Sequence, residues 1–496
     1  MPSKLESLQH RLADVNALHA AVAMMEWDQQ TFMPKGGGAA RAQHVGLLSR
    51  MAHEALVADE TQKLAKEAAK EVEGGTVSEA MVRVTQRDID LATKIPASLV
   101  EEKARLSAEA HEAWVEARAN ADFPKFQPML ERMVEIVKQE AEHLGYKAHI
   151  YDALIDQYEE GASEADCRAM FDTLKGPTVE LVREIKERGK RTDDSLLYGE
   201  WDEELQKHVT EQLVRSVGFD LERGRQDTAA HPFCTGWSVG DIRLTTRFKP
   251  YLGSAIFGSL HEAGHGMYEQ GSPAEWDLTP LQGGVSLGIH ESQSRLWENI
   301  IGRSRPFWKR FLPDIQATFP QISGMALENF YFAINQVEPS YIRVEADEVT
   351  YNLHVLLRFE IECDLLTGKL AVQDLPDAWN AKMEELFGIT PPSNREGCLQ
   401  DVHWSGGSIG YFPTYTMGNL LSYQIWNTLK KDIDDTDGLI SSGNFAPILS
   451  WLQEKIYSQG RRYRPKDLVM RVTGKPMGAE DYLEGLRTKY QEVYAL

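Results

Sequence analysis

Along most of the chain, apolar and polar positions alternate with the period of an amphipathic helix. Near the start, apolar residues recur every three or four positions, at Leu5, Leu8, Leu12, Val15, Leu18 and Val22. Residues with this spacing share one helix face, so a helix with one buried side is expected here. A Pro-Lys-Gly-Gly-Gly run at 34–38 interrupts it, and a second helix is predicted from about residue 39. The same helical spacing and helix-forming composition predict helices at 61–73, 97–121, 126–143, 164–188 and 203–216.

The spacing of apolar and polar residues changes between residues 231 and 249. The run at 239–248 alternates apolar with polar side chains and contains β-branched residues, which predicts one or two short strands. No sustained strand–helix alternation is present, so a parallel α/β sheet is not expected. Helical spacing returns from residue 287 onward. We therefore predict a mainly α fold, a large helical body with a small β-sheet. No repeat or long linker divides the 496 residues, which favours one domain over 1–496.

Composition narrows the range of partners. Hydrophobic residues make up 42% and charged residues 26%, as in ordinary globular proteins. The formal net charge of −22 argues against nucleic acid and against an anionic membrane surface. No apolar run approaches the roughly 20 residues of a membrane helix, and the first residues show no signal segment. The four scattered cysteines are expected to be reduced thiols, and we expect a cytoplasmic protein.

The stretch His261-Glu262-Ala263-Gly264-His265 carries the strongest chemical signal. On a helix, residues i and i+4 share a face, so the imidazoles of His261 and His265 can reach one metal ion. Glu262 then lies where a carboxylate can take a proton from a water molecule. The motif predicts a zinc-dependent hydrolase. The alternative is a solvated helix that carries two histidines.

The residues around this motif support the metal interpretation. Ile256, Phe257 and Leu260 are apolar and would anchor the helix in a core. Gly264 and Gly266 each weaken a helix by about 1 kcal/mol relative to alanine. Close approach of another backbone or of a substrate would explain why glycine occurs there.

A catalytic zinc takes three protein ligands and leaves one position open. Glu291 is the strongest candidate for the third ligand, because a glycine-rich loop at 283–284 and a helix expected over 287–299 can bring it back to His265. No Gly-x-x-His follows His265 to supply a third histidine. His290 points about 100° away from Glu291, so only one of them can bind the same ion. We prefer Glu291, with His290 as a supporting group or substrate contact. The alternative for Glu291 is an ordinary surface glutamate.

Six short blocks, in the same order, resemble the M32 metallocarboxypeptidases, the carboxypeptidases of the Taq type. The blocks are His-Pro-Phe (231–233), Asp-Ile-Arg-Leu-Thr (241–245), the 261–265 motif, His-Glu-Ser-Gln (290–293), Ile-Arg-Val-Glu-Ala-Asp (342–347) and Gly-Tyr-Phe-Pro-Thr-Tyr (410–415). The metal-binding positions show no departure from the family pattern. Together the six blocks are far more specific than any one of them.

The resemblance implies an almost wholly helical fold with a long, deep substrate groove. It implies that residues 1–120 form a helical region flanking the groove and that 230–420 carry the active site. It further implies a homodimer with one zinc ion per chain, cobalt being possible. The implied activity is removal of single residues from the free C-terminus of short peptides, with broad specificity.

The resemblance also assigns roles to single residues. His261, His265 and Glu291 would hold the metal, with Glu262 as general base. Tyr411, Tyr415 and His231 are candidates for stabilising the oxyanion, with Tyr411 and His231 preferred. The block at 410–415 is expected to be a loop, and a packed aromatic turn is the alternative.

Two arginines are candidates for binding the substrate. Arg343 matches the family position for the terminal carboxylate, which a guanidinium can bind through two parallel hydrogen bonds. We expect Arg343 to be partly buried in the groove, and the alternative is an ion pair with Glu345 or Asp347 on a helix. Arg243 and Tyr415 are further candidates for substrate contact. Arg243 could instead order the strand edge.

Other functions remain open at this stage. A zinc endopeptidase, oligopeptidase or dipeptidase could use the same metal site. An aminopeptidase is disfavoured, because no Gly-x-Met-Glu-Asn block is present to hold an α-amine. A non-catalytic helical binding protein with structural zinc is disfavoured too, because such sites are rich in cysteine and none lies beside the histidine pair.

Overall fold

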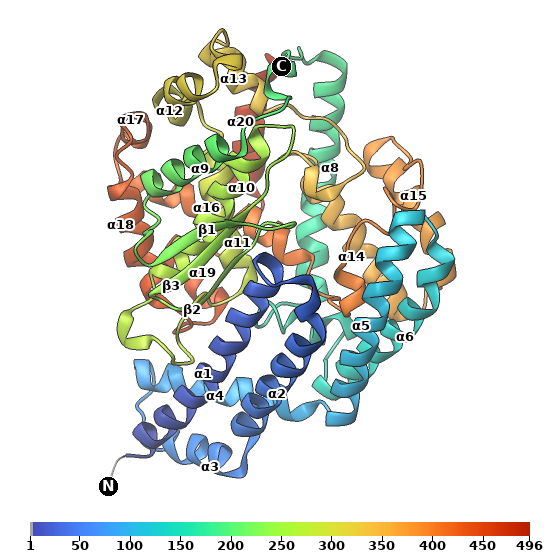
Figure 1. Ribbon diagram of the computed structural model, residues 1–496, viewed down its shortest axis with the longest axis vertical. Coiled ribbons are helices and arrows are strands. Elements are labelled where there is room, and N and C mark those ends of the chain that lie inside the picture. Colours follow the sequence, from blue (N-terminus) through green and yellow to red (C-terminus); the bar gives the residue numbers. More distant parts are fainter. Residues whose placement is uncertain (1–2) are drawn as a thin grey trace.

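The computed structural model describes residues 3–496, which form a mainly helical body (Figure 1). The predicted first helix is present and extends further than expected, as α1 (Lys4–Thr31). Ser3 and Glu6 cap its start reciprocally, each side chain accepting a hydrogen bond from the other's amide. The helices α2 (Gly38–Val57), α3 (Asp59–Ala68) and α4 (Val77–Lys94) follow. Helices α1, α3 and α4 share a small core of their own, formed by Leu8, Leu12, Ala65, Ala68, Val82 and Ile89.

The next part of the chain is also helical. Its members are α5 (Ala97–Asn120), α6 (Phe123–Leu144), α7 (Ile150–Ile155), α8 (Glu164–Arg188) and α9 (Glu203–Val217). The predictions at 97–121, 126–143, 164–188 and 203–216 agree with these bounds to within three residues. The prediction at 61–73 was too long, since α3 ends at Ala68.

A three-stranded sheet follows, in the order β1-β3-β2. Strand β3 (Asp241–Thr246) pairs antiparallel with β2 (Cys234–Ser238) and parallel with β1 (Gly224–Thr228). The predicted strand segment at 239–248 contains β3 alone. Strands β1 and β2 escaped prediction because glycine and polar residues dominate them. The fully buried Ile242 and Leu244 of β3 belong to the same apolar cluster as α10, so the sheet supports that helix.

Beyond the sheet, α10 (Gly253–Gln270) and α11 (Leu287–Arg295) carry the predicted motif residues. The expected helix at 287–299 is present, but a π-helical segment, η4 (Leu296–Ile301), continues α11. The other helices are α12 (Arg305–Thr318), α13 (Leu327–Ile334), α14 (Tyr351–Thr367), α15 (Leu375–Phe387), α16 (Pro413–Asp432), α17 (Thr436–Ser442), α18 (Ala446–Lys455), α19 (Pro465–Thr473) and α20 (Glu480–Tyr494).

Two large apolar clusters form the main core, and α16 belongs to both. Met417 and Leu420 pack in one with α6, α8 and α14, whereas Leu421 and Ile425 pack in the other with α9, α10 and α12. Helix α16 also packs along α11. The predicted mainly α fold with a small sheet beside the α10 helix is confirmed.

In residues 3–496, no helix combines the length and the apolar character needed to span a membrane.

Candidate metal centre and arginine cluster

Glycines allow α11 to lie unusually close to two other helices. A Cβ atom at Gly264 of α10 would come within 2.6 Å of the Gln293 carbonyl oxygen, and one at Gly418 of α16 within 2.4 Å of the Glu291 Cβ. Any side chain at either position would push α11 away. The helix-weakening Gly264 noted in the sequence therefore has a structural reason, because it lets Glu291 approach the histidine pair.

The three predicted metal ligands converge. His261, His265 and Glu291 each offer one donor atom, and these atoms lie within 4.8 Å of one another. The Glu291 Oε2 atom is 3.4 Å from His265 Nε2 and 3.7 Å from His261 Nε2. Two ligands about 2.1 Å from a tetrahedral zinc ion lie about 3.4 Å apart, so the donors fit such an ion with little movement. The donor set itself, two imidazoles and a carboxylate, is that of a catalytic zinc site.

A carboxylate holds the first histidine in place. His261 Nδ1 lies 2.9 Å from Glu298 Oε2, which fixes the ring with Nε2 toward Glu291. Glu298 comes from the π-helical segment η4, whose altered winding was not visible in the sequence. Arg295 and Arg303 in turn contact Glu298 at 3.2 and 3.4 Å.

A longer chain of contacts holds the second histidine. His265 Nδ1 lies 2.6 Å from His290 Nδ1, and His290 Nε2 lies 2.7 Å from Glu269 Oε1. The expectation that His290 supports a ligand is therefore matched by its contacts. Glu269 lies four residues after His265 on α10, one turn further along the same face.

Buried charges set the electrostatics of this centre. Burial opposes ionisation of Glu291, but Arg295 and His261 outweigh it and hold its pKa well below the ordinary range. Arg295 Nε donates to Glu291 Oε1 at 2.7 Å, which leaves Oε2 toward the histidines. Burial raises the pKa of Glu262 to about 7, against a lowering by His261. Glu262 is only 6% exposed, as a proton acceptor in a water-poor site would be.

Arg343 is fully buried, more deeply than expected, and lies in a short 3₁₀ turn at Arg343–Glu345. Its ion-pair partner is Asp401, and the predicted alternative of Glu345 or Asp347 is wrong. Arg343 Nε and Nη2 donate to Asp401 Oδ1 at 3.1 and 2.9 Å, and Nη1 donates to the Tyr351 hydroxyl at 2.7 Å. Arg358 donates to the other Asp401 oxygen at 2.6 Å. Two buried arginines thus share one carboxylate.

Arg243 has a different environment. Its Nε and Nη2 donate to the two Asp241 oxygens, each at 2.9 Å. The guanidinium carbon lies 4.1 Å from the Trp27 ring centre and 4.4 Å from that of Trp237. These contacts tie α1 to the sheet, which favours the structural alternative for Arg243.

The aromatic block at 410–415 is only half loop. Gly410–Phe412 is irregular, but α16 begins at Pro413, so Tyr415 lies in its first helical turn. The Tyr411 and Tyr415 rings meet edge to face at 5.3 Å, and Tyr158 packs on Tyr411 at 5.2 Å. Burial raises the pKa of Tyr411 to about 12, so its hydroxyl stays a donor at neutral pH. The predicted loop and the alternative of a packed aromatic turn are each partly correct.

His231 lies just before β2, close enough to Arg247 and Arg343 for their charges to act on its ring. Desolvation and the charges of Arg247 and Arg343 lower its pKa, so the ring is neutral at pH 7. A neutral imidazole retains one N–H donor.

Four residues that shape the site were not predicted. They lie outside the recognised motifs, and they are Glu298, Glu269, Asp401 and Arg358. The helical period offered one clue: Glu269 is the next same-face acid after His265.

A mainly helical body in which two histidines and a glutamate converge beside a buried carboxylate defines a metallopeptidase. Comparison with known proteins agrees. The sequence matches the carboxypeptidase Taq (M32) metallopeptidase family over residues 7–490. It is 41% identical to thermostable carboxypeptidase 1 of Thermus thermophilus over 489 residues, covering 95% of each chain, and 41% identical to the enzyme of the same name from Pyrococcus furiosus over 477 residues, covering 96% of each.

Solved structures give the same result. The crystal structure of the M32 carboxypeptidase from Deinococcus radiodurans superimposes with a TM-score of 0.97 at 38% identity, covering 99% of this chain and 100% of that one. The chain belongs to the M32 family of metallocarboxypeptidases.

Proposed function

We propose that this protein is a zinc-dependent carboxypeptidase that removes single residues from the free C-terminus of short peptides, with broad specificity. The observation that carries the proposal is the pairing of two sites: convergent metal donors beside buried Glu262, and buried Arg343 with a net positive environment. The first suits hydrolysis of an amide, and the second suits a terminal carboxylate. A cytoplasmic location, expected from the sequence, and a homodimer, implied by the family resemblance, are part of the same proposal.

His261, His265 and Glu291 hold the metal in this proposal. A zinc ion in this triad supplies Lewis-acid polarisation of a water molecule and of the scissile carbonyl, and cobalt could do the same. Arg295 neutralises Glu291 from behind, and Glu298 fixes the His261 ring. With Nε2 of His265 as the ligand atom, its Nδ1–H donates to His290 Nδ1, and the His290 Nε2–H then donates to Glu269.

Glu262 moves the proton. Its carboxylate accepts the proton of the attacking water and delivers it to the departing amine. Burial beside the ligands supports this role, because it brings the pKa of Glu262 to about 7, where the carboxylate can both accept and release a proton near neutral pH. Tyr411, Tyr415 and His231 are the candidate donors to the developing oxyanion, and we prefer Tyr411 and His231 over Tyr415.

Arg343 binds the terminal carboxylate. A guanidinium has five N–H donors, and Asp401 and Tyr351 accept three of those of Arg343. One N–H on each terminal nitrogen remains for two parallel hydrogen bonds to a substrate carboxylate. Tyr415 lies under the guanidinium, with its ring centre 4.9 Å from the guanidinium carbon.

The test is digestion of a defined peptide mixture with product masses read over time. We expect ladders shortened one residue at a time from the C-terminus, and loss of all cleavage after metal removal by a chelator. Internal cuts, or release of dipeptides, would instead establish the endopeptidase or dipeptidase alternative. Size-exclusion chromatography with light scattering tests the homodimer.

A further inference from the structure

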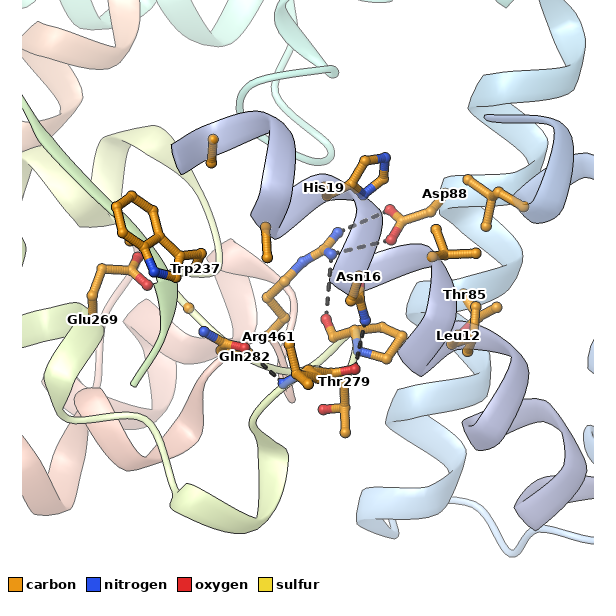
Figure 2. Close-up of a pocket in the computed structure, with 18 of the residues that line it drawn as sticks. Leu12, Asn16, His19, Thr85, Asp88, Trp237, Glu269, Thr279, Gln282 and Arg461 are labelled. Atoms are coloured by element: carbon orange, nitrogen blue, oxygen red, sulfur yellow. Dashed lines mark hydrogen bonds and ion pairs between the residues drawn. The ribbon is translucent and has the colours of Figure 1, made fainter. Parts of the chain in front are cut away.

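A cavity of about 490 Å³ lies beside the metal centre, between α1, α4, β2 and the loop that joins α10 to α11 (Figure 2). We call it the α1–β2 cavity. Its volume is in the range typical of ligand sites. Its wall includes Trp237 of β2, Asn16 of α1 and Glu269 of α10. Asn16 donates to the Leu278 carbonyl at 2.7 Å, so α1 is pinned to the loop at the cavity edge.

Most charges on the cavity wall are already paired. Arg461 donates to both oxygens of Asp88, at 2.9 and 3.1 Å, as Figure 2 shows. Desolvation lowers the pKa of His19, although Asp88 opposes this, so its ring is uncharged at neutral pH. The Asp88–Arg461 pair is neutral as a unit.

Glu269 is different, because only one of its oxygens is occupied. Oε1 accepts from His290 at 2.7 Å and from the Gly284 amide at 3.2 Å. Oε2 has no hydrogen-bond partner within residues 3–496. A Cβ atom at Gly283 would lie 3.0 Å from this oxygen, so the glycine keeps the space in front of it open. The cavity therefore carries one unshared negative oxygen.

The cavity and Arg343 lie at opposite ends of the contacts around the metal ligands. From His261 the contacts lead through Glu298 and Arg295 to the Tyr351 ring, which Arg295 overlies at 4.5 Å, and so to Arg343. From His265 the contacts lead through His290 to Glu269 and the cavity.

Strand β2 gives a second connection between the catalytic base and the cavity. Burial raises the pKa of the Cys234 thiol on this strand, and the charges of Glu262 and Glu269 raise it further. Two residues further on, Gly236 lines the cavity. A peptide held by its C-terminus at Arg343 would extend its upstream residues toward this side, at about 3.3 Å per residue.

We propose that the α1–β2 cavity binds a lysine or arginine side chain of the substrate, upstream of the scissile bond, and that Glu269 Oε2 receives its cationic group. The ligand class follows from the chemistry: a single unshared carboxylate oxygen in a partly enclosed site selects a protonated donor. This inference rests on the proposed carboxypeptidase function and adds an upstream preference to it.

The experiment compares peptides that share one neutral C-terminal residue. Lysine is placed one, two, three or four positions upstream of the scissile bond, and each peptide has a twin with norleucine, which keeps the aliphatic stem and lacks the charge. The measured quantity is the ratio of kcat/KM for each lysine peptide to that of its twin, because a ratio cancels any general change in activity.

Wild-type protein should show a ratio of about ten at one or two adjacent positions, from a charge-assisted hydrogen bond, and a ratio near one elsewhere. Glu269→Gln keeps an oxygen for the His290 hydrogen bond and removes the charge, so its ratio should fall to about one. Glu222→Gln, which changes an exposed acid on the turn before β1, is the matched control and should keep the wild-type ratio.

Two results would overturn the inference: no preference for lysine at any position, or a preference that survives in Glu269→Gln. If the norleucine peptides are hydrolysed and lysine gives no advantage, the cavity proposal is wrong and the proposed carboxypeptidase function stands. Absence of any C-terminal hydrolysis would remove the proposed function and this inference with it. Direct binding of the same peptide pairs to the metal-loaded Glu262→Gln variant gives a second readout that does not need turnover, with the same tenfold difference expected.

Discussion

The metal centre and the Arg343 cluster are both buried, but their charges are unbalanced in opposite directions. At the metal centre, the carboxylates of Glu262, Glu291 and Glu298 outnumber the guanidinium groups of Arg295 and Arg303.

At the Arg343 cluster, the excess is positive, because Arg343 and Arg358 share the single carboxylate of Asp401. An uncompensated charge is costly to bury, so each excess indicates a missing partner of the opposite sign. A divalent cation suits the first and a terminal carboxylate the second. The two sites therefore differ in the sign of the charge that each one lacks.

The largest effect is expected on the metal side. Glu262→Gln removes the proton acceptor and leaves His261, His265 and Glu291 intact. We predict a fall in kcat of about a thousandfold, with metal content unchanged, since general acid–base catalysis contributes about 10² to 10⁴. Steady-state kinetics with metal analysis of the same sample measures both. Near-normal turnover in this variant would show that another group moves the proton.

The carboxylate side is tested by Arg343→Met, which leaves Asp401 paired with Arg358. We predict a fall of about a hundredfold in kcat/KM for peptides with a free C-terminus, because a charge-assisted pair is lost. The same peptides with an amidated end should stay uncleaved by both proteins.

Arg243→Met is the matched control for that change. Its guanidinium is held by Asp241 between two tryptophan rings, so we expect lower thermal stability with the preference for a free C-terminus retained. If Arg243→Met abolished that preference and Arg343→Met did not, the two arginines would have to exchange roles.

A smaller effect is expected from changing Glu298, which orients the metal ligand His261. Glu298→Gln keeps a hydrogen-bond acceptor for His261 but removes its charge. We predict that zinc dissociates roughly 10- to 100-fold faster, measured by transfer to a chromogenic chelator. Glu328→Gln, an exposed acid paired with Arg305, serves as control and should release zinc at the wild-type rate. Equal rates in all three proteins would mean that Glu298 does not support the metal.

Folding stability, rather than activity, tests the group that holds the Tyr411 segment. Buried Glu362 accepts hydrogen bonds from Tyr151, Trp404 and the Gly410 amide. Burial raises the pKa of Glu362 to about 7, although Trp404 and Tyr151 lower it. Between about pH 4.5 and 7 the folded state therefore binds more protons than the unfolded state, and stability contributed here falls as pH rises.

Glu362→Gln cannot titrate, so it should lack this dependence. We predict that the stability of wild type relative to the variant falls by about 2.5 kcal/mol from pH 5 to pH 8, measured by urea unfolding at both values. A constant difference between the two proteins would contradict a raised pKa for Glu362.

The two sites also differ in how far the sequence could predict them. His261, Glu262 and His265 lie within one helical turn and a half, so periodicity alone places them together, and Glu291 follows one loop later. Arg343, by contrast, pairs with Asp401 far along the chain, and no local spacing relates the two. The alternative of an ion pair with Glu345 or Asp347 was wrong because it considered only neighbours in sequence.

The fold also contains elements that a local sequence pattern predicts and elements that depend on distant contacts. Helices such as α8 were predicted to the residue because their apolar period is local. Strands β1 and β2 were missed, since pairing with β3 across the sheet stabilises segments that carry no strand pattern of their own. The π-helical segment η4, which supplies Glu298, packs against α10 and α16, and no local sequence pattern marks its winding.

The most direct test of the account uses one peptide in two forms, with a free C-terminus and with an amide, and protein freed of metal and reloaded with one equivalent of zinc. We predict that zinc restores activity and that only the free-acid peptide is shortened, by one residue at a time. Equal cleavage of both forms, or activity without metal, would contradict the claim that a metal centre and a carboxylate-binding cluster act together.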